Sequence, residues 1–128
     1  MRLVHLKTEG RLPTSSYNLV AEGGDVIGFA QLRHRASQNQ DLPPEAGNHV
    51  FYTIAEPRRG QGHGKTLLRL VLDEARRIGL DRVRLTVDDS NPTSRIIIQG
   101  AGGQLVGEFV SRTGKLYRLF EVSFLRVA

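Results

Sequence analysis

The residues with the clearest chemistry form a glycine-rich run at positions 58–66, Arg-Arg-Gly-Gln-Gly-His-Gly-Lys-Thr. The run follows a strand-like stretch at 50–54 and leads into a strongly helical stretch at 66–78. A glycine-rich turn that opens a helix presents several backbone N–H groups to one point, and the helix dipole adds positive potential there. Glycine also lets the backbone take a positive φ and touch a ligand. The run therefore predicts a phosphate or pyrophosphate site, with a plain glycine-rich turn as the alternative.

Two common phosphate loops do not fit this run. A Walker loop requires glycine where the chain has Arg59. The dinucleotide fingerprint fails because its last glycine falls on Lys65 or Leu67, although Asp88 stands at a suitable distance for a ribose-binding acid. A third pattern, Arg/Gln-x-x-Gly-x-Gly/Ala, is filled by Arg59, Gly62 and Gly64.

A second segment, Asn-Pro-Thr-Ser-Arg at 91–95, lies about 30 residues downstream and is followed by glycines at 102 and 103. Asn91 is a good N-cap, and proline suits the first helical position, where Pro92 stands. Gly100 is expected to end the helix. Taken alone, the segment predicts only a short capped helix.

Together these segments resemble the GNAT superfamily of N-acetyltransferases. The first is similar to the acyl-CoA pyrophosphate loop of that superfamily, and the second to its Asn-x-x-Ala/Ser helix. Leu-Arg-His at 32–34 and the strand at 49–54 are similar to one branch of predicted bacterial acetyltransferases, whose strands carry Leu-Arg-His and Gly-His-Ile-Gly-Tyr. The resemblance implies an acetyl-CoA-dependent enzyme that moves an acetyl group to a primary amine by direct attack in a ternary complex.

The same resemblance implies where acetyl-CoA binds. In the superfamily two central parallel strands splay apart, and the pantetheine arm pairs with the exposed backbone of the first, which here is the strand at 52–55. The implied cofactor-binding residues are Thr53, Ile54, Ala55, Arg59, Gly60, Gln61, Gly62, His63, Gly64, Lys65, Asn91 and Ser94.

The acceptor amine must lose a proton before it attacks. A lysine-type amine has a pKa of about 10, so a base or a water chain is useful at neutral pH. The candidates for the base are His49, Asp88 and His34. The related branch also has histidine at the position of His49. A histidine held in the sheet is the alternative for His49, and a helix cap is the alternative for Asp88.

Many members of the superfamily place a tyrosine general acid on the second helix. The corresponding position here is Ile98, which cannot donate a proton. Ser94 faces the same way one turn earlier and is an alternative acid, as are Tyr52 and a water molecule. The predicted catalytic residues are His49, Ser94 and Asp88.

The pattern of elements predicts an α/β fold with a mixed central sheet of the acyl-CoA N-acyltransferase type. Strands are expected at 1–6, 17–21, 25–33, 49–55, 82–87, 104–109 and 116–125, and helices at 66–78 and after position 91. In the first helix, Leu67, Val71 and Ala75 share one face, and Asp73 and Arg77 are spaced for an ion pair. The stretches at 8–16 and 36–48 are expected to be turn-rich and loop, respectively.

Many relatives carry two helices between their first and second strands, which wall the acceptor pocket. This chain offers only residues 8–16 there, so we expect a short version of the fold with reduced N-terminal helices and an open acceptor side. An exposed sheet edge and an apolar rim would favour a homodimer. Residues 36–48 or the strand at 116–125 are expected at its interface.

Composition limits the number of domains, the metal chemistry and the cellular location that we expect. With 128 residues, 39% hydrophobic and 24% charged, we expect a single soluble domain over residues 1–128. The chain has no cysteine, which excludes disulfides and thiolate metal ligands, and we expect no metal. No apolar run reaches membrane-spanning length and no apolar signal segment follows Met1, so we expect a cytoplasmic protein with no membrane partner.

The net charge of +5 favours polyanionic ligands, among which coenzyme A and nucleic acids are candidates. Only 6% of residues are aromatic and no strand interleaves aromatic and basic residues, so we do not expect nucleic-acid binding. The expected acceptor is a small-molecule or protein amine. A non-catalytic acyl-CoA-binding module of the same fold is the alternative, favoured by the missing tyrosine and the short front end.

Overall fold

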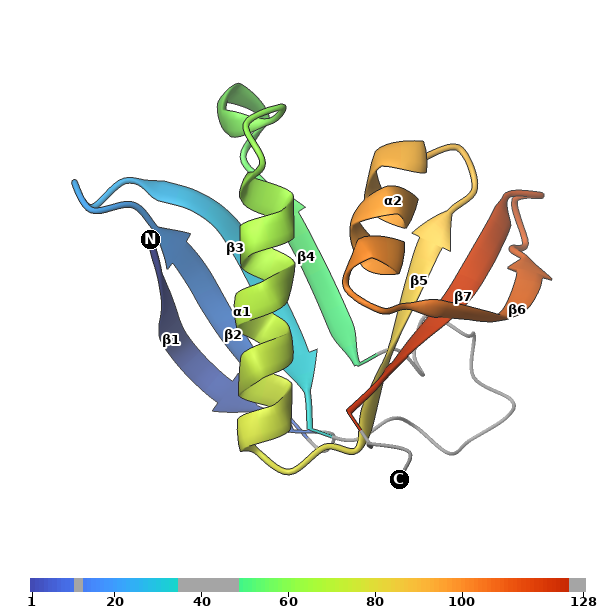
Figure 1. Cartoon of the computed structure of the whole chain (residues 1–128), viewed down its shortest axis with the longest axis horizontal. Helices are drawn as coiled ribbons and strands as arrows, with labels where there is room; N and C mark the ends of the chain where they lie inside the picture. The colour runs from blue at the N-terminus through green and yellow to red at the C-terminus, as the bar shows by residue number, and fades with distance from the viewer. Residues whose placement is uncertain (11–12, 35–48, 125–128) are drawn as a thin grey trace.

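The computed structural model describes residues 1–10, 13–34 and 49–124 and consists of two antiparallel sheets with a helix against each (Figure 1). The first sheet has the order β1 (Arg2–Glu9), β2 (Thr14–Val20), β3 (Val26–Arg33), β4 (Val50–Ile54). The second has the order β5 (Arg82–Asp88), β7 (Leu116–Ser123), β6 (Gln104–Val110). The predicted α/β class is confirmed.

Two α-helices are found within the described ranges, α1 (His63–Arg77) and α2 (Pro92–Gly100), and both follow β4 in the chain. β1 ends at Glu9 and β2 begins at Thr14, so no helix pair fits between them. This confirms the prediction of reduced N-terminal helices. Neither helix of the described part is long and apolar enough to cross a membrane.

Strands β4 and β5 run parallel and splay apart between the two sheets (Figure 1). They are joined at their lower end, where the His49 N–H donates to the Arg84 carbonyl at 3.0 Å. Above this point each strand pairs only with its antiparallel neighbour, β3 or β7. The mixed sheet predicted from the sequence is therefore present as two antiparallel sheets that meet at one parallel, diverging pair.

Helix α1 packs across the first sheet, with further contacts to β5 and α2, because one of its faces is apolar (Figure 1). Its buried residues are Leu67, Leu68, Val71, Leu72 and Ala75. The helix ends at Arg77, one residue before the predicted end, and is followed by Gly79 at a φ of 95° and by the Leu80 N–H donating to the Ala75 carbonyl. The predicted Asp73–Arg77 ion pair is wrong, because Arg77 instead binds both carboxylate oxygens of Glu74, at 2.8 Å for the closest atoms.

The polar stretch at 8–16 is mostly strand rather than turn. Thr8 pairs with Ser15 in the β1–β2 register. Ser15 is buried, and its hydroxyl bonds both the Thr8 hydroxyl, at 2.7 Å, and His34 Nε2, at 2.6 Å. These polar side chains satisfy one another, so a sequence that looks turn-rich can enter a sheet. The expected loop at 36–48 lies outside the described residues.

Candidate active site

The glycine-rich run forms a loop that opens helix α1, as predicted. Gly60 and Gly62 have φ values of 79° and 81°, a region that favours glycine, and Gly62 is the N-cap of α1. The N–H groups of Gly62, His63, Gly64 and Lys65 have no acceptor among the described residues. Four free N–H groups at a helix start, together with the positive end of the helix dipole, form an anion site.

Side chains around the loop hold it in place. Arg59 Nε donates to the Ile54 carbonyl at 3.0 Å, which ties the loop to the end of β4. The His63 ring and the Gln61 side chain bond each other at 3.1 Å, so His63 serves the loop mainly through its backbone. Neither contact uses the free N–H groups at the start of α1, which stay available to an anion.

The open edge of β4 begins beside this loop. The Ala55 N–H donates to the Ile27 carbonyl of β3 at 2.8 Å. Since backbone groups of alternate residues point to opposite edges of a strand, Thr53 also faces β3, whereas Tyr52 and Ile54 face the open edge. The N–H groups of Thr53 and Ala55 therefore serve the sheet, so at these two residues the predicted cofactor contact cannot use the backbone N–H. The N–H of Ile54 faces the open edge.

A cavity of about 480 Å³ lies between the splayed strands. β3 and β4 line one side of it, and β5, the start of α2 and Tyr117 of β7 line the other. The cavity brings together all three predicted catalytic residues, His49, Asp88 and Ser94, with Tyr52, Asn91 and Ile98.

His49 is buried at the base of the cavity and holds the two sheets together. Its Nδ1 accepts a hydrogen bond from the Arg84 backbone N–H at 3.0 Å. A backbone N–H can only donate, so the neutral ring carries its proton on Nε2 and neither nitrogen is free to take another. Burial, reinforced by the nearby Arg84 charge, lowers the pKa of His49. The geometry therefore favours the alternative role for His49, a histidine held in the sheet.

Ser94 and Tyr52 meet across the cavity. Their hydroxyl groups are hydrogen-bonded at 3.0 Å, and this bond runs from β4 to α2. The Ser94 N–H donates to the Asn91 side chain at 3.1 Å, which confirms Asn91 as the N-cap. Burial raises the pKa of Tyr52, with the Ser94 hydrogen bond acting in the opposite direction.

Asp88 lies at the rim of the cavity, where β5 ends. Its Oδ1 accepts from the backbone N–H and the hydroxyl of Ser90, at 2.9 and 2.8 Å. These hydrogen bonds lower the pKa of Asp88, with a smaller contribution from Lys115, 3.8 Å away. A carboxylate with a lowered pKa is a weak base, but it remains charged at neutral pH and can hold a cation.

The structure does not bring His34 into the cavity, because its Nε2 bonds the buried Ser15 hydroxyl at 2.6 Å. Ile98, at the position where the resemblance led us to look for a tyrosine, is only 1% exposed and belongs to the hydrophobic core.

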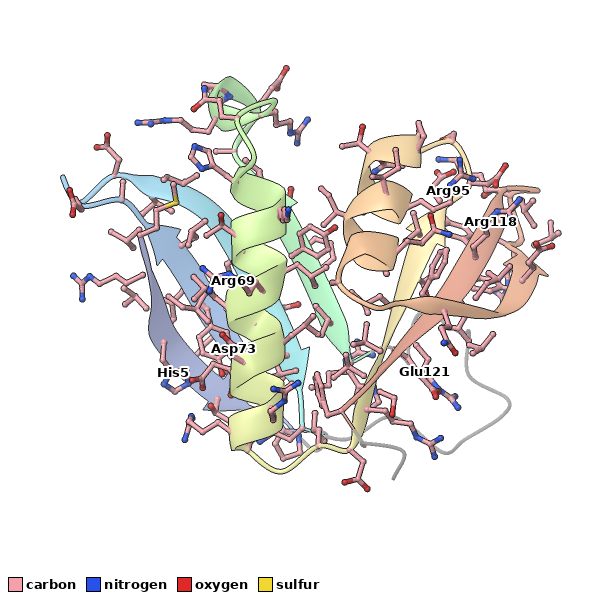
Figure 2. The ribbon with its side chains drawn as sticks, viewed as in Figure 1. His5, Arg69, Asp73, Arg95, Arg118 and Glu121 are labelled. Atoms are coloured by element: carbon pink, nitrogen blue, oxygen red, sulfur yellow. The ribbon has the colours of Figure 1, made fainter. Side chains whose placement is uncertain are left out.

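A cluster of ion pairs holds the start of α2 in place. Sequence analysis did not indicate this cluster. Arg118 Nε of β7 donates to Asp89 Oδ1 at 2.6 Å, and Arg95 Nη1 of α2 lies 3.7 Å from the same oxygen (Figure 2). Arg118 also lies 3.3 Å from Glu108 of β6. The cluster fixes the β5–α2 turn, and with it Asn91 and Ser94. Glu108 and Arg118 are far from Asp89 and Arg95 in sequence, so no local pattern could have indicated the whole cluster.

A helix-start anion loop beside the open edge of a splayed parallel strand pair defines an acyl-CoA-binding type of fold. The chain belongs to the acetyltransferase (GNAT) family, whose model matches residues 3–97. A search of the curated proteins finds no match.

Solved structures share the fold. A spermidine N-acetyltransferase from Vibrio cholerae superposes with a TM-score of 0.71 at 17% identity, covering 86% of this chain and 65% of that chain. An acetyltransferase of the same family from Bordetella pertussis gives 0.67 at 18% identity, covering 86% and 66%. A protein described as a phosphinothricin N-acetyltransferase gives 0.69 at 18%, covering 89% and 69%. The chain thus spans 65% of the length of the Vibrio enzyme.

Proposed function

We propose that this chain is an acetyl-CoA-dependent N-acetyltransferase that acts on a primary amine by direct attack within a ternary complex. The observation that carries the proposal is the junction of three features: the free N–H groups at the start of α1, the open edge of β4, and the cavity behind it. A ligand with a pyrophosphate at one end and a thin hydrogen-bonding arm at the other fits this arrangement. Acetyl-CoA has that form, and it is the acetyl donor of this family.

In the proposed complex the pyrophosphate binds the N–H groups between Gly60 and Lys65, and the arm lies along β4. The open edge presents the backbone of Tyr52 and Ile54 to the thioester carbonyl. A fixed N–H group there would stabilise the negative charge that builds on the carbonyl oxygen during attack. Holding thioester and amine side by side would supply much of the remaining acceleration.

The acceptor amine would enter through the cavity rim beside Asp88. We infer that the Asp88 carboxylate attracts the ammonium form and that the proton then leaves through water. His49 is not the base in this scheme, since its Nδ1 is occupied by the Arg84 N–H. The rate is then expected to rise with pH as the acceptor amine loses its proton, with no step set by His49.

The acceptor belongs to the class of primary amines, in a small molecule or a protein. One similar structure is that of the Vibrio cholerae spermidine N-acetyltransferase in complex with CoA and spermine, at 17% identity. Polyamines therefore belong in any first panel of acceptors, next to amino acids, aminoglycosides and peptides with free amines.

A non-catalytic acyl-CoA-binding module is the second candidate, because Ile98 replaces the usual tyrosine. The two functions differ in turnover. Release of free thiol from acetyl-CoA, measured against the amine panel, tests catalysis, and calorimetry with CoA tests binding. Binding without thiol release for any amine would favour the non-catalytic module, and absence of CoA binding would refute both.

We further propose that residues 1–128 act as one domain, that the protein works in the cytoplasm, and that it forms a homodimer. The expected interface needs revision, because β7 is the central strand of the second sheet and is flanked by β5 and β6. The edge of that sheet is β6, so we place the dimer contact there. Residues 36–48, the other expected interface segment, lie outside the described residues.

A further inference from the structure

We propose that Tyr52 is the general acid of this protein and gives its hydroxyl proton to the departing thiolate, with Ser94 as the positioning residue. This proposal rests on the proposed acetyl transfer. It assigns to strand β4 a role that relatives give to a tyrosine on the second helix. Four observations carry it.

The first observation is that Ile98, at the position of the superfamily's tyrosine acid, cannot donate a proton. Ile98 has no ionisable group, is 1% exposed and packs in the core. Gly103 approaches it so closely that a Cβ there would lie 2.6 Å from Ile98 Cγ2. This part of α2 is therefore a packing surface, and the proton donor must come from elsewhere in the cavity.

The second observation is the place of the Tyr52 side chain. Along β4 it shares a face with Val50 and Ile54, the face that packs under α1. Its ring lies beneath the start of that helix, since a Cβ on Gly64 would lie 3.9 Å from Tyr52 Cε2. The hydroxyl end of the ring thus lies below the anion loop, on the path from the loop into the cavity.

The third observation is the hydrogen bond from Tyr52 to Ser94, 3.0 Å long, which crosses from one half of the molecule to the other. Both residues line the cavity. In the proposed complex, the pantetheine arm that follows the open edge of β4 would pass this hydroxyl pair. Ser94 is itself fixed by its N–H bond to Asn91 and by the Asp89–Arg118 ion pair behind it.

The fourth observation concerns protonation. Burial raises the pKa of Tyr52, so the phenol keeps its proton through neutral pH. Asp88 is ionised there and the neutral His49 ring is committed to Arg84. Among the hydroxyl groups of the cavity, which include those of Thr86 and Tyr117, Tyr52 and Ser94 form the pair that joins β4 to α2.

The proposed step transfers the acetyl group from the sulfur of CoA to the amine nitrogen. The amine nitrogen forms a bond to the acetyl carbon, and the carbon–sulfur bond breaks with its electron pair going to sulfur. The Tyr52 O–H proton passes to that sulfur and gives the free thiol of CoA. The new amide nitrogen loses its extra proton to water, and the tyrosinate regains a proton from water through the Ser94 hydroxyl.

The test compares Tyr52→Phe with wild type under conditions where the wild type releases thiol. We expect Tyr52→Phe to bind CoA within about two-fold of wild type while kcat falls by about 100-fold or more, because general acid–base catalysis contributes about 10²–10⁴-fold. Wild-type kcat should fall at high pH as Tyr52 ionises, and this alkaline limb should vanish in the variant. Tyr17→Phe is the matched control, since it removes a hydroxyl from a buried tyrosine that does not line the cavity.

Ser94 provides the second arm. Ser94→Ala should lower kcat by a smaller factor and move the alkaline limb, and Ser94→Thr, which keeps a hydroxyl, should restore both. Full kcat in folded Tyr52→Phe would overturn the proposal, as would a loss confined to CoA binding. A wild type that binds CoA but acetylates no amine would overturn the proposed function, and this role of Tyr52 with it.

Discussion

Gly62 meets two requirements of the anion loop. Its φ is positive, and the absence of a side chain would let a ligand approach its backbone closely. Nothing lies within 4 Å of where its Cβ would stand, so the protein itself leaves room for a ligand there. We expect Gly62→Asp to weaken CoA binding ten-fold or more, since a charge-assisted hydrogen bond is worth about 1.5–3 kcal/mol. Isothermal calorimetry measures the effect.

Gly114→Asp is the control for that substitution. Gly114 has a φ of 83°, also has open space at its Cβ position, and lies in the β6–β7 turn. Both variants carry the same backbone strain and the same added charge, so both should lose similar stability. Only Gly62→Asp should lose affinity. Equal CoA binding by the two variants would remove the loop from the cofactor site.

His49 makes the stability of the fold depend on pH. Burial, aided by Arg84, lowers the pKa of His49 in the folded chain below the value of about 6.5 expected when unfolded. As pH falls through that value, the unfolded chain takes up a proton that the folded chain refuses, so the free energy of unfolding decreases.

We predict that His49→Gln makes stability less sensitive to acid. Glutamine keeps an oxygen that can accept the Arg84 N–H but does not titrate. Urea unfolding at about pH 7.5 and about pH 5.5, on either side of the unperturbed histidine pKa, should show a larger loss for wild type than for the variant. Identical losses would mean that His49 is protonated in the folded chain.

Sequence reasoning found the residues of this site that are contiguous in the chain. The loop from Gly60 to Lys65 and the cap at Asn91 depend on local backbone geometry, which local sequence specifies. The Tyr52–Ser94 bond and the occupied Nδ1 of His49 arise only when β4 meets α2 and β5. Such contacts between distant elements decide which candidate is chemically available, and no spacing rule reports them.

Among the secondary-structure elements, the packing of α1 on the first sheet depends on Gly28 of β3. A Cβ at this position would lie 2.8 Å from the Thr53 carbonyl oxygen, 2.9 Å from Ile54 Cδ1 and 3.1 Å from Leu67 Cδ2. Those atoms belong to β4 and α1, the two elements that form the cofactor site. An added methyl group would push both away from β3.

We predict that Gly28→Ala destabilises the fold by about 1–3 kcal/mol, the usual cost of overpacking a core. It should also weaken CoA binding, because the open edge of β4 would shift. Gly23→Ala is the control, since its Cβ would meet nothing within 4 Å, and it should change stability by less than about 0.5 kcal/mol. Urea unfolding that ranks the two variants equally would contradict the packing argument.

Most of the helices and strands could be predicted from the sequence. Apolar periodicity located α1, and strand-like stretches located β2, β3, β6 and β7, because both signals are local. The stretch at 8–16 was misread, since Ser15 is polar and yet buried, with its hydroxyl bonded to Thr8 and His34. A buried serine looks like a turn residue until its partners are known.

At the scale of the whole molecule, the two sheet edges differ in character. The edge strand β1 carries charged or polar side chains at Arg2, His5, Lys7 and Glu9, which discourage pairing with another chain. The edge strand β6 exposes Leu105, Val106 and Val110 at 47%, 52% and 65%, and its one carboxylate, Glu108, is already paired with Arg118. This apolar edge is the surface that we propose for the contact with a second copy of the chain.

We therefore predict a homodimer joined through β6. A double variant, Val106→Lys with Val110→Lys, should shift the protein to monomer in sedimentation velocity, because two like charges would meet their copies across a two-fold axis. Ile96→Lys is the control: Ile96 is 67% exposed on α2 and is not part of the edge strand, so the variant should remain dimeric. A wild type that sediments as a monomer at micromolar concentration would refute the dimer. A dimer that survives the double substitution would move the interface away from β6.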